Sequence, residues 1–125
     1  MSNSRRYEIL LPLKFNDGQS VPWTLIGETL VELKQRFSSV SWETQIIHGI
    51  WQHQGAEFRD DLVRVFVDVT DLPENRQFFV SLKSQLKSRF RQLDIWMTTY
   101  SARTSITSGS SLRPNTVLHL PSVSR

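Results

Sequence analysis

Four valines recur at every second position between residues 63 and 69, and this alternation constrains the fold more than any other part of the chain. Successive side chains of a β-strand point to opposite faces of the sheet. Val63, Val65, Val67 and Val69 therefore define a strand face that must lie on the core. The other face of this strand is mixed in character and consists of Leu62, Arg64, Phe66 and Asp68.

A second strand-like run precedes these valines, and we expect the two runs to form a β-hairpin at the centre of the chain. The runs are Trp42–Trp51 and Phe58–Val69, and the turn-prone segment Gln52–Ala56 joins them. Gly49 lies inside the first run, where a glycine indicates a bulge or a close backbone approach.

One short strand and one amphipathic helix are expected on the N-terminal side of the hairpin. Residues Tyr7–Phe15 alternate in polarity, which predicts a half-buried strand, and Pro12 favours a sheet edge or a bulge. A helix is expected to begin near Ser20–Pro22. Its buried stripe repeats with helical spacing and comprises Leu25 or Ile26, then Leu30, Leu33 and Phe37.

The C-terminal side of the hairpin repeats this plan. Asp71–Glu74 has the pattern of a capping box, and the helix after it is expected to bury Phe78, Phe79, Leu82, Leu86, Phe90 and Leu93. The last strand is expected at Asp94–Tyr100. A weak internal repeat between Leu33–Phe37 and Leu86–Phe90 supports two similar halves.

The order of these elements predicts an α+β fold. We expect a ferredoxin-like βαββαβ sandwich, in which two helices cover one face of a four-stranded antiparallel sheet. The domain is placed at residues 1–101, and residues 102–125 are expected to be a Ser/Arg-rich tail that is mostly flexible.

Composition excludes several classes of site. The chain has no cysteine, which excludes disulfides, thiolate metal sites and a cysteine nucleophile. The formal net charge is +3, and Arg103, Arg113 and Arg125 account for all of it, because the preceding charges cancel. No apolar run approaches the roughly 20 residues of a membrane span. The N-terminus lacks the apolar core of a secretion signal, so we expect a cytoplasmic protein.

The sheet face without helices is the main candidate for function. Its expected interface residues are Leu62, Arg64, Phe66, Trp96 and Tyr100. An apolar face of this size is seldom left bare in a stable monomer. We therefore expect a non-catalytic domain that docks on another protein or self-associates, with a homodimer as the simplest closed assembly.

Two other functions are kept open. A dimeric α/β-barrel-type protein would bind or convert a small molecule between two sheets, with His48, Trp51, Arg64 and Tyr100 as the candidate pocket lining. A nucleic-acid binder would use the basic helix stripe of Arg76, Lys83, Lys87 and Arg91 together with the basic tail. The acidic start of the third strand, Asp60-Asp61, and its lack of glycine disfavour an RNA-recognition motif.

The sequence contains no convincing catalytic centre, and no cofactor is expected. His48 and His53 are five residues apart on a strand, so their side chains point to opposite sides and do not form a metal site. The segment Asn16-Asp17-Gly18 lacks the glycine run and the lysine of a phosphate-binding loop.

Several short segments are similar to those of a family of short uncharacterised bacterial proteins, a domain of unknown function with this strand and helix order. They are Tyr7–Leu13 with Asn16-Asp17-Gly18, then Gly49-Ile50-Trp51, Pro73–Phe79 and Arg89–Gln92. The resemblance extends from about Tyr7 to Tyr100. It implies a small stand-alone bacterial domain, and it transfers no functional residues because the family has no established activity.

Overall fold

The computed structural model describes residues 3–102, which form one antiparallel sheet and two helices. In chain order the elements are β1 (Ser4–Pro12), α1 (Trp23–Phe37), β2 (Ser41–Trp42), β3 (Ile47–His53), β4 (Ala56–Thr70), α2 (Pro73–Arg89) and β5 (Trp96–Ser101). The expected tail at residues 102–125 lies outside the described residues, apart from Ala102.

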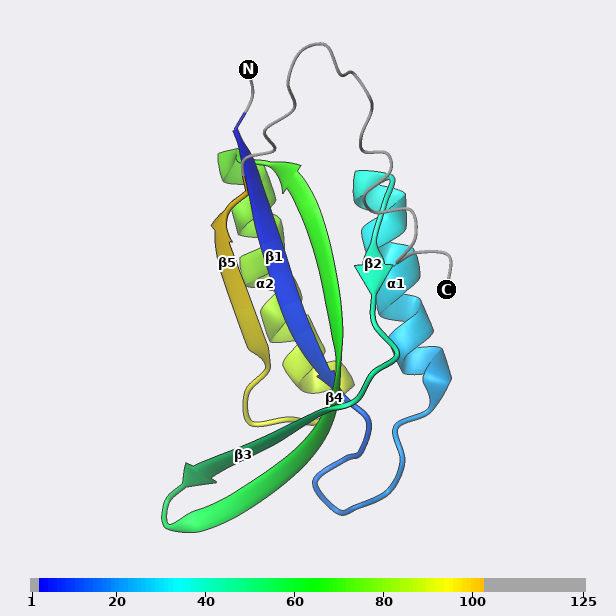
Figure 1. The fold of residues 1–125 in the computed structure, drawn as a ribbon, viewed down its shortest axis with the longest axis vertical. Coiled ribbons are helices and arrows are strands. Elements are labelled where there is room, and N and C mark those ends of the chain that lie inside the picture. Colours follow the sequence, from blue (N-terminus) through cyan, green and yellow to red (C-terminus); the bar gives the residue numbers. More distant parts are fainter. Residues whose placement is uncertain (1–2, 103–125) are drawn as a thin grey trace.

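The sheet has the strand order β2-β4-β1-β5, and β3 pairs with β4 beyond the end of β2. Both helices lie on the same side of the sheet (Figure 1). The predicted α+β class and the antiparallel sheet are confirmed, but the sheet has five strands rather than four.

The extra strand arises because the predicted strand Trp42–Trp51 is divided. Trp42 pairs with Val65, and the next pair is Ile47 with Leu62. Residues 43–46 thus face only residues 63–64 of β4, which leaves two residues looped out. Glu43 lies in this break and forms two hydrogen bonds with Arg64. Its backbone N–H donates to the Arg64 carbonyl oxygen (3.0 Å), and its carboxylate accepts from the Arg64 guanidinium (3.1 Å).

Gly49 is not the bulge, because it pairs in register with Asp60. The predicted close approach of a backbone is not found either, because a Cβ at Gly49 would meet the Leu62 side chain, at 3.3 Å. The hairpin turn is shorter than expected. Gln54 and Gly55 have positive φ values of 52° and 82°, as in the two-residue turns that suit twisted hairpins.

One expectation about strand and helix ends holds locally and one is wrong. β1 lies between β4 and β5, but its pairing with β5 ends at Leu10, so Pro12 lies at a local edge and its missing N–H leaves no ladder bond unmade on that side. Asp71 does not cap α2. Leu72 holds the cap position without a side-chain bond, and Asp71 instead pairs with Arg5 (3.3 Å) and Arg76 (2.8 Å).

The core lies between the sheet and the helices. Val63, Val65, Val67 and Val69 are all buried there, as the alternation predicts. The rings of Tyr7 and Phe79 stack with centroids 3.8 Å apart, which joins β1 to α2. Leu93 is 52% exposed rather than buried, because α2 ends at Arg89 and the chain turns away before reaching it.

This difference in burial predicts different costs for two leucine truncations. Leu86→Ala should lower the free energy of unfolding by about 2–5 kcal/mol, because it leaves a cavity in the packed core. Leu93→Ala removes the same atoms from an exposed site and should cost less than about 1 kcal/mol. Chemical denaturation of both variants measures the difference. Equal losses would contradict the observed end of α2.

Candidate functional site

The sheet face opposite the helices, called the open face here, carries charged side chains at its centre. Strand pairing places alternate residues of β1, β4 and β5 on it. They are Arg6, Glu8, Leu10, Leu62, Arg64, Phe66, Asp68, Trp96, Thr98 and Tyr100. The face is therefore amphipathic rather than mainly apolar.

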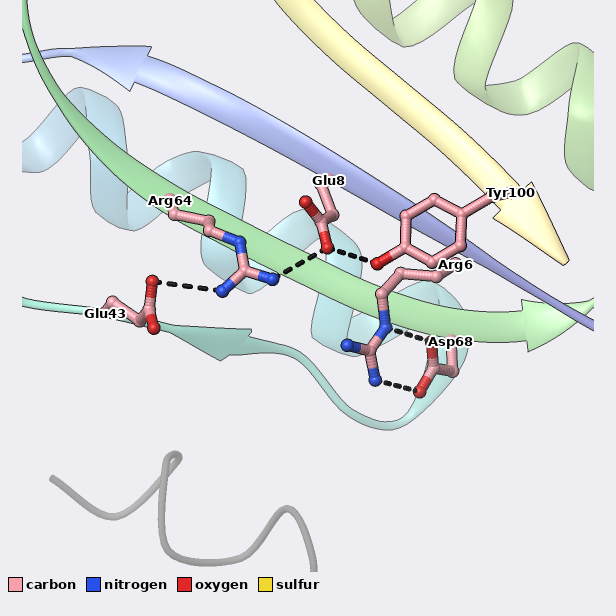
Figure 2. A network of polar contacts seen from close by, with 6 residues as sticks. All are labelled: Arg6, Glu8, Glu43, Arg64, Asp68 and Tyr100. Carbon is pink, nitrogen blue, oxygen red and sulfur yellow. Dashed lines mark hydrogen bonds and ion pairs between the residues drawn. The ribbon is translucent and has the colours of Figure 1, made fainter. Parts of the chain in front are cut away.

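Glu8 is the centre of a hydrogen-bonded network on this face (Figure 2). Its Oε2 accepts from Arg64 Nη2 at 2.7 Å and from the Tyr100 hydroxyl at 2.6 Å. The other terminal nitrogen of Arg64 donates to Glu43 at 3.1 Å. The network therefore joins β1, β4, β5 and the break between β2 and β3.

The protonation of this network is stable near neutral pH. The Arg64 guanidinium lowers the pKa of Glu8, and the Tyr100 hydroxyl adds to this effect against partial burial. The Glu8 carboxylate in turn raises the pKa of Tyr100 above its ordinary value. Glu8 is thus held ionised and Tyr100 protonated, which suits a structural or binding role better than proton transfer at neutral pH.

Two arginines cover the Phe66 ring. The guanidinium carbons of Arg6 and Arg64 each lie 4.7 Å from its centroid. Arg6 also forms a bidentate pair with Asp68, with distances of 2.7 and 2.9 Å (Figure 2). Phe66 is therefore part of a cation–π stack and half-buried, whereas the sequence suggests a bare apolar anchor.

A pocket of about 410 Å³ continues the open face toward the hairpin, and we call it the hairpin pocket. Leu10, Pro12 and Leu62 contribute apolar surface from β1 and β4. Trp51 and Asp60 contribute from the hairpin, and Asp94 and Trp96 from the start of β5 and the loop before it. Figure 1 shows the hairpin projecting beneath this loop.

The structure places all five predicted interface residues on the open face and separates the predicted pocket residues. Leu62, Arg64, Phe66 and Tyr100 share the open face, and Trp96 lies on it at the pocket end. Of the candidate pocket, Arg64 and Tyr100 are in the Glu8 network, whereas Trp51 lines the hairpin pocket. His48 is strongly exposed and pairs with Asp61 at 2.8 Å.

The predicted basic stripe is also divided. Arg76, Lys83 and Lys87 line a groove of about 500 Å³ between α2 and β5. Arg76 is paired with Asp71, and Lys83 with Asp94 at 3.3 Å. Arg91 is not part of this groove, and its guanidinium stacks 3.9 Å from the Phe15 ring centroid.

Sequence reasoning missed the acidic half of the network. Glu8, Glu43 and Asp68 were not candidates for a site, whereas Asp60 was considered only as part of a metal or acid/base site at the hairpin. The alternation already placed Glu8 and Asp68 on the face away from the core, so their position was readable. The hydrogen-bonding partners of Glu8 and Asp68 could not be predicted, because they depend on the register between strands that are distant in the sequence.

Among residues 3–102, no three metal-ligating side chains converge, and no helix is long and apolar enough to cross a membrane. No protein-family model matches the chain, and no curated protein matches it.

Solved structures do resemble it. A phage SAM lyase in complex with S-methyl-5'-thioadenosine is 14% identical with a TM-score of 0.60, over 83% of this chain and 92% of that one. CutA1 from Oryza sativa is 12% identical with a TM-score of 0.54, over 83% of this chain and 84% of that one. The apo state of a phage SAM lyase is 16% identical with a TM-score of 0.52, over 80% of both chains. At these identities the likeness concerns the fold alone, which is ferredoxin-like α+β.

The Glu8 network predicts a pH-dependent contribution to stability. The pKa of Glu8 is lower in the folded state, so its contribution is complete above the ordinary carboxyl pKa and disappears as pH falls through the folded value. Glu8→Gln should cost about 1 kcal/mol at neutral pH and much less in acid. Urea denaturation at several pH values measures this.

Glu57→Gln is a matched control for that experiment, since Glu57 pairs with Arg59 in an exposed part of the hairpin. Exposed ion pairs contribute about 0–1 kcal/mol, so Glu57→Gln should leave the free energy of unfolding nearly unchanged at every pH. A pH-independent loss in Glu8→Gln would contradict the assigned network.

Proposed function

We propose that this domain self-associates through its open face, with a second copy of the chain as the partner. We assign it a binding role, because the central carboxylate, Glu8, already accepts hydrogen bonds from Arg64 and Tyr100. The proposal rests on one observation above all, namely that the charged side chains at the centre of the open face are already paired with one another.

This internal pairing matters because a buried charge without a partner is costly. Arg6 has Asp68, and Arg64 has both Glu8 and Glu43. Docking would therefore desolvate existing pairs and leave no lone charge. Tyr100 (43% exposed) adds aromatic surface of the kind that is enriched in protein interfaces.

Charge balance favours a second copy over a strongly charged partner. Two arginines and three carboxylates leave the region with a formal charge of −1. Two such faces repel weakly, whereas a highly acidic or basic partner gains little from them. A two-fold axis would then bring the open faces together and bury the patch on both copies.

The nucleic-acid alternative has weaker support. Arg76 and Lys83 are paired with acids, and Arg91 stacks on Phe15 away from the groove that the other three basic residues line. A phosphate backbone would have to compete with these contacts.

Thr98→Asp tests self-association at a position whose own side chain is not part of the Glu8 network. Thr98 is exposed on β5 and pairs with Glu8, so the new carboxylate adds negative charge at the centre of the open face and would repel the same face of the partner. We expect the wild type to be oligomeric by light scattering. The dissociation constant of the Thr98→Asp oligomer should be about tenfold or more higher than that of the wild type.

Thr24→Asp, an identical substitution at an exposed site on α1, is the control and should keep the wild-type mass. A monomeric wild type at high micromolar concentration would refute the proposal. So would a Thr98→Asp variant that associates as tightly as the control.

A further inference from the structure

We propose that the hairpin pocket binds a planar aromatic ligand that carries a positive charge or an amino group, with Trp51 and Trp96 as stacking surfaces and Asp60 as its charge partner. This inference goes beyond self-association and does not depend on it, because all the residues that it uses belong to one copy of the chain.

The Trp51 indole is held in place before any ligand arrives. It packs on Phe58 with ring centroids 4.6 Å apart and 21° between planes. Its N–H donates to Asp60 Oδ2 at 2.6 Å. These two contacts fix the ring on the hairpin wall, so little entropy is lost when a flat molecule stacks on it.

Trp96 supplies an indole from the other wall of the pocket. It begins β5, faces the open side of the sheet and is 56% exposed. Leu10, Pro12 and Leu62 provide aliphatic surface between the two walls. Aromatic and aliphatic surfaces of this kind accept a planar ring, and a volume of about 410 Å³ lies in the usual range for ligand sites.

Asp60 determines the charge that the ligand should carry. It is half-buried, and within residues 3–102 no lysine, arginine or histidine forms an ion pair with it. Its hydrogen bond comes from the neutral indole of Trp51. A partly desolvated carboxylate without a cation favours a positively charged or N–H-donating ligand.

The other charged residues of the pocket do not reverse this preference. The lining holds two carboxylates, Asp60 and Asp94, and among the described residues that form it Lys87 is the only lysine or arginine, so its formal charge is −1. The electron-rich faces of two indoles further favour a cation over an anion. The site therefore selects aromatic cations and aromatic amines, and it rejects carboxylates and phosphates.

Two planar dyes of similar ring size and opposite charge test this assignment. Proflavine is cationic and carries amino groups, whereas anthracene carboxylate is anionic. Each is titrated into the full chain while the indole N–H signals of the four tryptophans are followed by NMR. Proflavine should shift the Trp51 and Trp96 signals in a saturable way and leave Trp23 and Trp42 unchanged. Anthracene carboxylate should bind at least about tenfold more weakly.

Three variants complete the test. Trp96→Ala should weaken proflavine binding by about fivefold or more, whereas Trp23→Ala removes a similarly exposed indole (64% against 56%) from α1 and should have no effect. Asp60→Asn keeps an oxygen that can accept the hydrogen bond from the Trp51 indole but removes the negative charge. It should therefore reduce the difference in affinity between proflavine and anthracene carboxylate. Equal binding of both dyes, or no saturable shift at Trp51 and Trp96, would overturn the proposal. Thr98 does not line the pocket, so Thr98→Asp should bind proflavine normally even if self-association is lost.

Discussion

The antiparallel pairing of β1 with β4 is the constraint on which the rest of this structure depends. Nine residue pairs, from Ser4 with Thr70 to Pro12 with Leu62, join the two strands at the centre of the sheet. This register places Ile9 against Val65 on the core side, and Glu8 against Phe66 on the open side. A slip of this register by one residue would expose the valines and bury the charged side chains, so the core and the Glu8 network both require the same register.

The same register explains why the open face is built from ion pairs. Directly opposite and diagonal residues on one sheet face are close enough to bond. Arg6 meets Asp68 directly, and Glu8 reaches Arg64 along the diagonal. With Tyr100 from β5 and Glu43 from the break before β3, these contacts leave the centre of the sheet polar but internally satisfied. A face of this kind can be exposed to water or be buried against a partner without leaving lone charges.

The length of β4 connects this face to the hairpin pocket. β4 extends past β1 and pairs with β3 to form a hairpin that projects beyond the helices (Figure 1). A two-stranded hairpin is marginal by itself, and contacts such as Trp51 with Phe58 and with Asp60 stabilise this one. These contacts also hold the indole at the pocket, so local stability and the proposed binding site depend on the same residues.

Periodicity in the sequence was sufficient to predict the α+β class, the order of the main elements, the valine face of the core and which strand residues point away from it. These features follow from local geometry, because side-chain direction repeats every two residues in a strand and about every 3.6 in a helix. The break in the second strand, the exposed Leu93, the unused capping box at Asp71 and the partners of Glu8 depended on contacts between distant segments. Arg64 and Tyr100 are 56 and 92 residues from Glu8 along the chain. Only the tertiary register brings them to one carboxylate, because alternation determines the face of a strand residue and leaves its neighbour on the next strand undetermined.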